Sequence, residues 1–265
     1  MKDALIFASY IPQGAWAEYY IGYLKVILKY FPPADTDIFV GINPTGSEEE
    51  KRWVKRLESL GIPYVFAPEE TVVASDVSAF QAALTLFNQS TEGYRNVWFG
   101  HTKGITSHRE WFPALIEEKF WSKRSEATKA LEVEQVGSWG PFVTPIADIT
   151  TIPPTIVDTG KLDLLVSNLP KTALPIMYVF THYVIKATIV KEFLKLATES
   201  KEANIFNVNI VNELGGDIYF FEREFGTLAS RFGYWMDYTA EIAPHYPFIR
   251  DDFLTIRKNW IKENF

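Results

Sequence analysis

The sequence contains no cysteine, which excludes disulfide bonds, cysteine nucleophiles and thiolate metal sites. It also lacks any stretch approaching the roughly 20 apolar residues of a membrane helix. The first residues, MKDALIFASY, carry an apolar run too short for a signal peptide. Together these absences predict a soluble, cytoplasmic protein without an integral membrane segment.

Positive charge is in deficit, with 26 Lys and Arg against 33 Asp and Glu and a net charge of −7. Bulk capture of nucleic acid requires a basic face that displaces counterions, so no nucleic-acid partner is expected. A local basic pocket for one small anion is compatible with this balance. At 265 residues the chain can bury one large core, as one big domain or a domain with a helical extension, because a single core stops growing near roughly 250–300 residues. We therefore expect one continuous core and a single domain over residues 1–265.

Short apolar runs alternate with amphipathic stretches over about the first hundred residues. The apolar runs predict strands that are covered on both faces. The stretches between them carry helix signals such as the Ser47-to-Glu50 capping box. Strands that alternate with helices imply crossover connections and a mainly parallel sheet. The expected strands are residues 4–8, 38–42, 64–67 and 97–99.

Beyond Gly104 the regular alternation of strands and helices ends, and the sequence predicts a helix-rich C-terminal part. The fold class is therefore predicted as α/β, a Rossmann-like central sheet flanked by helices with this extension. Residues 152–175 are rich in proline and are not assigned. The expected elements are a helix starting near Ser107 or Pro113, a loop and strand over 137–146, a strand over 176–180, and helices over 183–198 and 216–233.

Several common motifs are missing. The first strand is not followed by Gly-x-Gly-x-x-Gly, and there is no phosphate loop and no Gly-x-Ser-x-Gly nucleophile elbow. The histidines lack the pairing of a helical zinc site, so ordinary hydrogen bonding is expected for His182 and His245. The acidic pair Asp35 and Asp37 precedes a strand, which favours a solvated turn at the amino edge of the sheet over a metal site.

Ligands of open parallel sheets bind beyond the carboxyl ends of the strands. There the sequence places Ser9-Tyr10, Asn43, Pro68-Glu69 and the segment from Gly100 to Gly104. The last segment suits a diphosphate, because glycines allow close approach, a lysine supplies positive charge and a histidine donates hydrogen bonds. The candidate phosphate-binding residues are His101, Lys103, Gly104, His108 and Arg109.

Each of these assignments has a structural alternative. Lys103 could be solvated, Gly104 could only turn the chain, and His101 could bond to a carbonyl. Carboxylates also surround Gly215-Gly216, where Glu213 or Asp217 could act as a general base. Their alternative role is to complement the positive end of a helix dipole.

Three stretches carry a resemblance to a known family: SDVSAFQAAL, NVWFGHTKGITSHREW and GGDIYFFEREFGTL. They resemble A-type glycosyltransferases, in particular a branch near rhamnan and other surface-polysaccharide synthesis proteins. The resemblance implies a nucleotide-diphosphate sugar as donor and a glycan or other hydroxyl as acceptor. It also implies that Ser9 and Tyr10 lie by the base, Asp76 by the base or ribose, and His101 and Lys103 by the diphosphate.

The chain departs from this family at the Asp-x-Asp motif that usually holds a divalent metal, where it has His101-Thr102-Lys103. The departure predicts a transfer without a metal cofactor, with fixed positive charge at the leaving diphosphate. The resemblance further implies a nucleotide-binding half over residues 1–104, an acceptor-side half over 105–265, and Glu213 or Asp217 as the catalytic base.

Two other classes of function are weighed against transfer. The missing acidic pair is also compatible with a catalytically inactive member of the fold that binds a glycan or a protein. A dinucleotide enzyme would need the glycine fingerprint that the sequence lacks.

Overall fold

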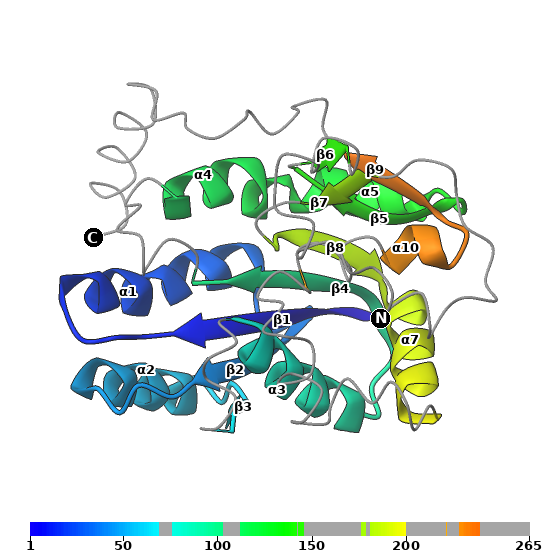
Figure 1. Ribbon diagram of the computed structural model, residues 1–265. Helices are drawn as coiled ribbons and strands as arrows, with labels where there is room; N and C mark the ends of the chain where they lie inside the picture. Colours follow the sequence, from blue (N-terminus) through cyan, green and yellow to red (C-terminus); the bar gives the residue numbers. More distant parts are fainter. Residues whose placement is uncertain are drawn as a thin grey trace.

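The computed structural model describes residues 1–68, 76–102, 112–141, 143–145, 176–178, 181–199, 221 and 228–238 (Figure 1). No helix in these ranges is long and apolar enough to cross a membrane. The strands are β1 (Lys2–Tyr10), β2 (Thr36–Asn43), β3 (Tyr64–Phe66), β4 (Tyr94–His101), β5 (Val136–Gly140), β6 (Val143–Pro145), β7 (Ile176–Tyr178), β8 (Tyr183–Lys186) and β9 (Trp235–Tyr238). The helices are α1 (Ala15–Tyr30), α2 (Glu48–Ser59), α3 (Asp76–Gln89), α4 (Phe112–Lys119), the 3-10 helix η2 (Trp121–Lys123), α5 (Arg124–Glu132), α7 (Ala187–Glu199) and α10 (Leu228–Arg231).

The central sheet has seven strands in the order β3-β2-β1-β4-β8-β5-β9. Strands β3, β2, β1 and β4 are parallel, whereas β8 is antiparallel to both of its neighbours. Strands β6 and β7 form a separate antiparallel pair. The predicted α/β class, a mainly parallel sheet flanked by helices, is confirmed.

The sheet buries side chains on both faces, as the apolar run ALIFA in β1 predicts. On one face α3, α7 and α10 pack against residues such as Ile6 and Phe99. On the other face α1, α2, α4 and α5 pack against residues such as Phe7 and Trp98. Successive residues of each strand therefore contribute to different halves of the core.

Helix α3 lies directly on β2 because Gly41 has no side chain. A Cβ atom at this position would lie 1.7 Å from the carbonyl oxygen of Ala79 and 2.6 Å from its carbonyl carbon. The close packing fixes the height of α3 above the sheet. It thereby places the first residue of α3, Asp76, at the edge where the parallel strands end.

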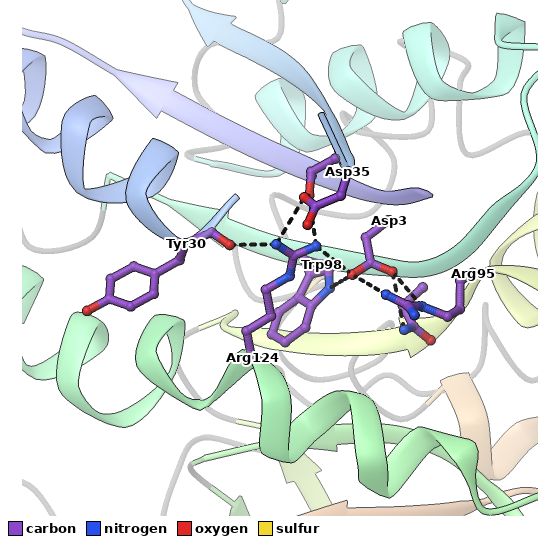
Figure 2. Close-up of polar contacts among 8 residues, drawn as sticks. Asp3, Tyr30, Asp35, Arg95, Trp98 and Arg124 are labelled. Carbon is purple, nitrogen blue, oxygen red and sulfur yellow. Dashed lines mark hydrogen bonds and ion pairs between the residues drawn. The ribbon is translucent and has the colours of Figure 1, made fainter. Parts of the chain in front are cut away.

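The opposite, amino edge of the sheet is held by the buried carboxylate of Asp3 (Figure 2). Asp3 is fully buried and accepts hydrogen bonds from Arg95 Nε at 3.1 Å, Arg124 Nη2 at 3.0 Å and Trp98 Nε1 at 3.4 Å. Arg124 also donates to the Tyr30 carbonyl at 2.6 Å. One carboxylate thus ties β1 to β4 and to α5.

Two expected elements differ in the structure. The segment expected to be a helix over 183–198 begins as β8 and becomes helical only at Ala187. The loop and strand expected over 137–146 contain two strands, β5 in the central sheet and β6 paired with β7. In both cases pairing with distant strands overrides the local pattern. Within the helix expected over 216–233 the described residues include α10, and the unpredicted edge strand β9 follows it.

Buried tyrosines should make the fold sensitive to alkali. Burial raises the pKa values of Tyr20 and Tyr23 well above the ordinary value, and burial together with the hydrogen bond to Asp37 raises the pKa of Tyr94 to about 12. A raised folded-state pKa contributes stability that is present below about pH 10 and is lost as the pH rises towards the folded value. We expect the free energy of unfolding to fall steeply between about pH 10 and 12.

Urea unfolding over this pH range checks the expectation. In Tyr94→Phe one ionising group is removed, so the decline should be shallower by at most about 1.4 kcal/mol per pH unit. Equal slopes in the two proteins would contradict the assignment of Tyr94.

Candidate functional site

The candidate site follows from the order in which the strands enter the sheet. After β1 the chain adds β2 and β3 on one side and then returns to place β4 on the other side. The order reverses between β1 and β4, and ligands of open α/β sheets bind at such a point, outside the carboxyl ends of the strands. The residues at these two ends are Ser9 and Tyr10 on β1, His101 at the end of β4, and Thr102 directly after it.

Thr102 joins the two strand ends directly. Its hydroxyl accepts a hydrogen bond from the Tyr10 backbone N–H at 3.0 Å and donates one to the Tyr10 carbonyl at 3.3 Å. Its own N–H donates to the carbonyl of Ala8 at 3.1 Å. Sequence reasoning placed Thr102 between two candidate residues but assigned it no role of its own.

The side chain of Ser9 points into the protein. It is 1% exposed, and its hydroxyl donates to the Gly41 carbonyl at 3.1 Å. Ser9 therefore lies at the predicted edge while its hydroxyl bonds to β2. Tyr10, which follows it, is half-buried and lies at the end of the strand.

His101 is accompanied by a second histidine that the sequence analysis did not place in the site. The ring of His182, just before β8, lies 5.3 Å from the ring of His101, and both residues are buried. Gly100 makes room for the ring of Trp121, because a Cβ there would lie 2.4 Å from it, and this ring packs edge-on against His182. Thr181 adopts φ 52°, and among the described residues it is the only non-glycine residue with a positive φ.

The loop after β1 is anchored to the start of α2. The Ile11 carbonyl accepts hydrogen bonds from Thr45 Oγ1 at 2.9 Å and Ser47 Oγ at 2.8 Å. Ser47 caps α2 as expected, accepting from the Glu50 N–H at 3.0 Å, but the Glu50 carboxylate bonds to the N–H groups of Thr45 and Gly46. The chain's own carboxylate thus occupies the amide N–H groups of Thr45 and Gly46 in this loop.

Most of the other predicted site residues lie outside the described ranges. Asp76 begins α3 at the carboxyl edge, and the structure describes its backbone only. For the remaining residues the predicted positions stay predictions. Those outside the described ranges are Lys103, Gly104, His108, Arg109, Glu213 and Asp217.

The described part of the site does not fit a divalent metal. Mn²⁺ and Mg²⁺ prefer carboxylate oxygens, and the side chains described at the ends of β1 and β4 are hydroxyls and imidazole. Over the described residues no group of three or more His, Asp or Glu side chains could hold a metal ion.

A groove of about 310 Å³ lies at the opposite, amino edge of β2 and β4. Polar side chains that line the groove are bonded to one another or to a neighbouring lysine. Tyr94 donates to Asp37 at 3.0 Å and bonds to Ser90 at 2.9 Å, and Lys2 donates to Asp37 at 2.8 Å. Because these side chains are already bonded within the protein, the candidate site is placed at the carboxyl edge instead.

Comparison with known proteins finds no matching protein-family model. A search of curated proteins finds no match either. Among solved structures, glucosyl-3-phosphoglycerate synthase from Mycobacterium tuberculosis with phosphoglyceric acid is 10% identical with a TM-score of 0.37, covering 98% of this chain and 78% of that one. The same enzyme with Mn²⁺ and UDP-glucose is 11% identical with a TM-score of 0.36, covering 98% and 77%.

Core-mannan synthase A from Aspergillus fumigatus, in an Mn/GDP form, is 11% identical with a TM-score of 0.38, covering 100% of this chain and 86% of that one. At these identities and TM-scores the likeness assigns no activity to the chain. The expectation of a transfer without a divalent metal is contradicted by these structures, which hold Mn²⁺ with UDP-glucose or GDP, and it is withdrawn.

Proposed function

We propose that the chain is a glycosyltransferase that moves a sugar from a nucleotide-diphosphate sugar to a hydroxyl of a glycan or other acceptor. The observation that carries the proposal is the meeting of Tyr10, His101 and Thr102 at the point where the strand order reverses. The resemblance of the segments around Asp76 and His101 to A-type glycosyltransferases supplies the substrate class and favours polysaccharide synthesis.

In this proposal the donor lies across the ends of β1 and β4. Tyr10 lies by the base and Asp76 by the base or ribose, since both belong to elements that end or begin at this edge. Ser9 precedes Tyr10 at the end of β1 and therefore also lies by the base. His101, Lys103 and Gly104, with His108 and Arg109 further along, take the diphosphate. Fixed positive charge stabilises the negative charge that develops as the sugar–phosphate bond breaks.

The transfer also needs a base. As the acceptor oxygen bonds to the anomeric carbon, the bonding electrons of the sugar–phosphate bond leave with the diphosphate and the acceptor proton passes to a carboxylate. We assign this proton transfer to Glu213 or Asp217. A positioned carboxylate typically contributes about 10²- to 10⁴-fold to the rate of such a step.

A thermal-shift screen with UDP, GDP, CDP and dTDP, each with and without Mn²⁺, tests the proposal. A ligand at 100 times its dissociation constant stabilises the folded state by about 2.7 kcal/mol, which is a readily measured shift in Tm. A shift with one nucleotide supports a donor site. No shift under any condition would contradict the proposal and favour an inactive binding module.

Reversing the charge of Lys103 should weaken nucleotide binding. Lys103→Glu places a carboxylate beside the diphosphate, so we expect the affinity measured by isothermal titration calorimetry to fall by about tenfold to a hundredfold, roughly 1.4–2.7 kcal/mol. The control is Lys129→Glu in α5, an exposed lysine on another part of the fold. Unchanged affinity in Lys103→Glu would remove this residue from the site.

A further inference from the structure

The backbone of Tyr10 has an unusual partner on its β4 side. Regular pairing between β1 and β4 extends to Ala8 and His101, whereas pairing between β1 and β2 continues to Tyr10 and Asn43. The hydroxyl of Thr102 supplies the missing partner, since it accepts from the Tyr10 N–H at 3.0 Å and donates to the Tyr10 carbonyl at 3.3 Å. One side chain therefore continues the sheet where its backbone ladder stops.

The Thr102 hydroxyl bonds to the backbone of Tyr10. The residue is 6% exposed, and its hydroxyl uses its proton and one lone pair on Tyr10. Such a hydroxyl is poorly placed to bind a ligand itself. It is well placed to fix the distance between the end of β1 and the end of β4, since both of its hydrogen bonds go to the main chain.

We propose that Thr102 is a positioning residue that holds the nucleoside side of the donor site, at Tyr10, in register with the diphosphate side, at His101. This inference rests on the proposed function. Without the hydroxyl the two strand ends separate more freely, and a nucleotide that contacts both must then order them on binding. Thr102 acts through the backbone of Tyr10 and not by touching the reacting atoms.

Two substitutions at Thr102 separate the hydroxyl from the shape of the side chain. Thr102→Val keeps the branched shape and removes both hydrogen bonds, while Thr102→Ser keeps the hydroxyl. The matched control is Thr36→Val at the amino edge, where a buried threonine hydroxyl accepts from Arg124 Nη2 at 3.0 Å. All three variants are made in the full chain.

The readout is the dissociation constant of the nucleoside diphosphate that gives the largest thermal shift with the wild-type protein. In Thr102→Val, a nucleotide that orders the two strand ends also buries the Tyr10 N–H without a partner. This cost is about as large as a tenfold change in affinity, so we expect Thr102→Val to bind about tenfold more weakly. Thr102→Ser should recover affinity to within about threefold. Thr36→Val should lower Tm while leaving the affinity unchanged.

Hydrogen exchange at the Tyr10 amide gives a second measurement that does not depend on a ligand. Exchange should be faster in Thr102→Val than in the wild type and close to the wild-type rate in Thr102→Ser. Equal nucleotide affinity in Thr102→Val and the wild type would overturn the inference and leave the proposed function standing. If no nucleotide binds the wild type, the proposed function fails, and this inference fails with it.

Discussion

Replacing Gly41 with alanine is expected to lower the free energy of unfolding by roughly 3 kcal/mol. The new Cβ would lie 1.7 Å from the carbonyl oxygen of Ala79 and 3.0 Å from the amide nitrogen of Ala83, both backbone atoms of α3. No rotation of a side chain relieves this overlap, so α3 must move away from β2. The loss is large against a typical stability of about 5–15 kcal/mol.

Gly93→Ala is the matched control for this substitution. The nearest atom to a Cβ at Gly93 is the Met1 sulfur at 4.0 Å, and this residue does not adopt a positive φ. Urea unfolding of Gly93→Ala should give a free energy close to that of the wild type or slightly above it. A Gly41→Ala protein as stable as Gly93→Ala would show that α3 does not rest on β2 as described.

Removing the carboxylate of Asp3 is expected to lower the free energy of unfolding by about 3–5 kcal/mol. Asp3→Ala leaves Arg124, whose side chain is 16% exposed, without the buried one of its two carboxylate partners, at 3.0 Å, and leaves Trp98 Nε1 without an acceptor. A buried cation and an unsatisfied donor each favour the unfolded chain, in which water solvates both. Chemical denaturation at pH 7 measures the loss.

Asp35→Ala provides the comparison, because Asp35 bonds to the same arginine at 3.2 Å but its side chain is 57% exposed. Exposed ion pairs contribute at most about 1 kcal/mol, so this variant should remain close to the wild type. Equal losses in the two variants would indicate that burial does not distinguish the carboxylates. A small loss in both would show that Arg124 finds other partners.

The N-terminal half of the sheet could be predicted from the sequence because its signals are local. The run ALIFA is apolar throughout, α1 ends next to Pro32-Pro33, and Ser47 caps α2 through its own side chain. The prediction for Tyr183–Lys186 was wrong because a short buried strand followed at once by a helix has the same apolar pattern as one longer helix. Only its pairing with β4 distinguishes the two.

The candidate site was predictable to the extent that it follows the ends of parallel strands. That rule placed Tyr10 and His101 at one edge, where the structure has them. It did not reveal the bonds from Thr102 to Tyr10 or the inward turn of the Ser9 hydroxyl, since these depend on the register between strands far apart in the sequence. Glu50 was expected to cap its helix, but the amides that it contacts precede Ser47.

The reversed direction of β8 changes which part of the chain reaches the carboxyl ends of β1 and β4, where the candidate site lies. A parallel strand brings the residues that follow it to that edge, but an antiparallel strand brings the residues that precede it. His182 reaches His101 in this way, from the entrance of β8 and not from its exit. A motif search restricted to segments downstream of strands therefore overlooks residues such as His182, and the upstream neighbours of reversed strands merit mutagenesis of their own.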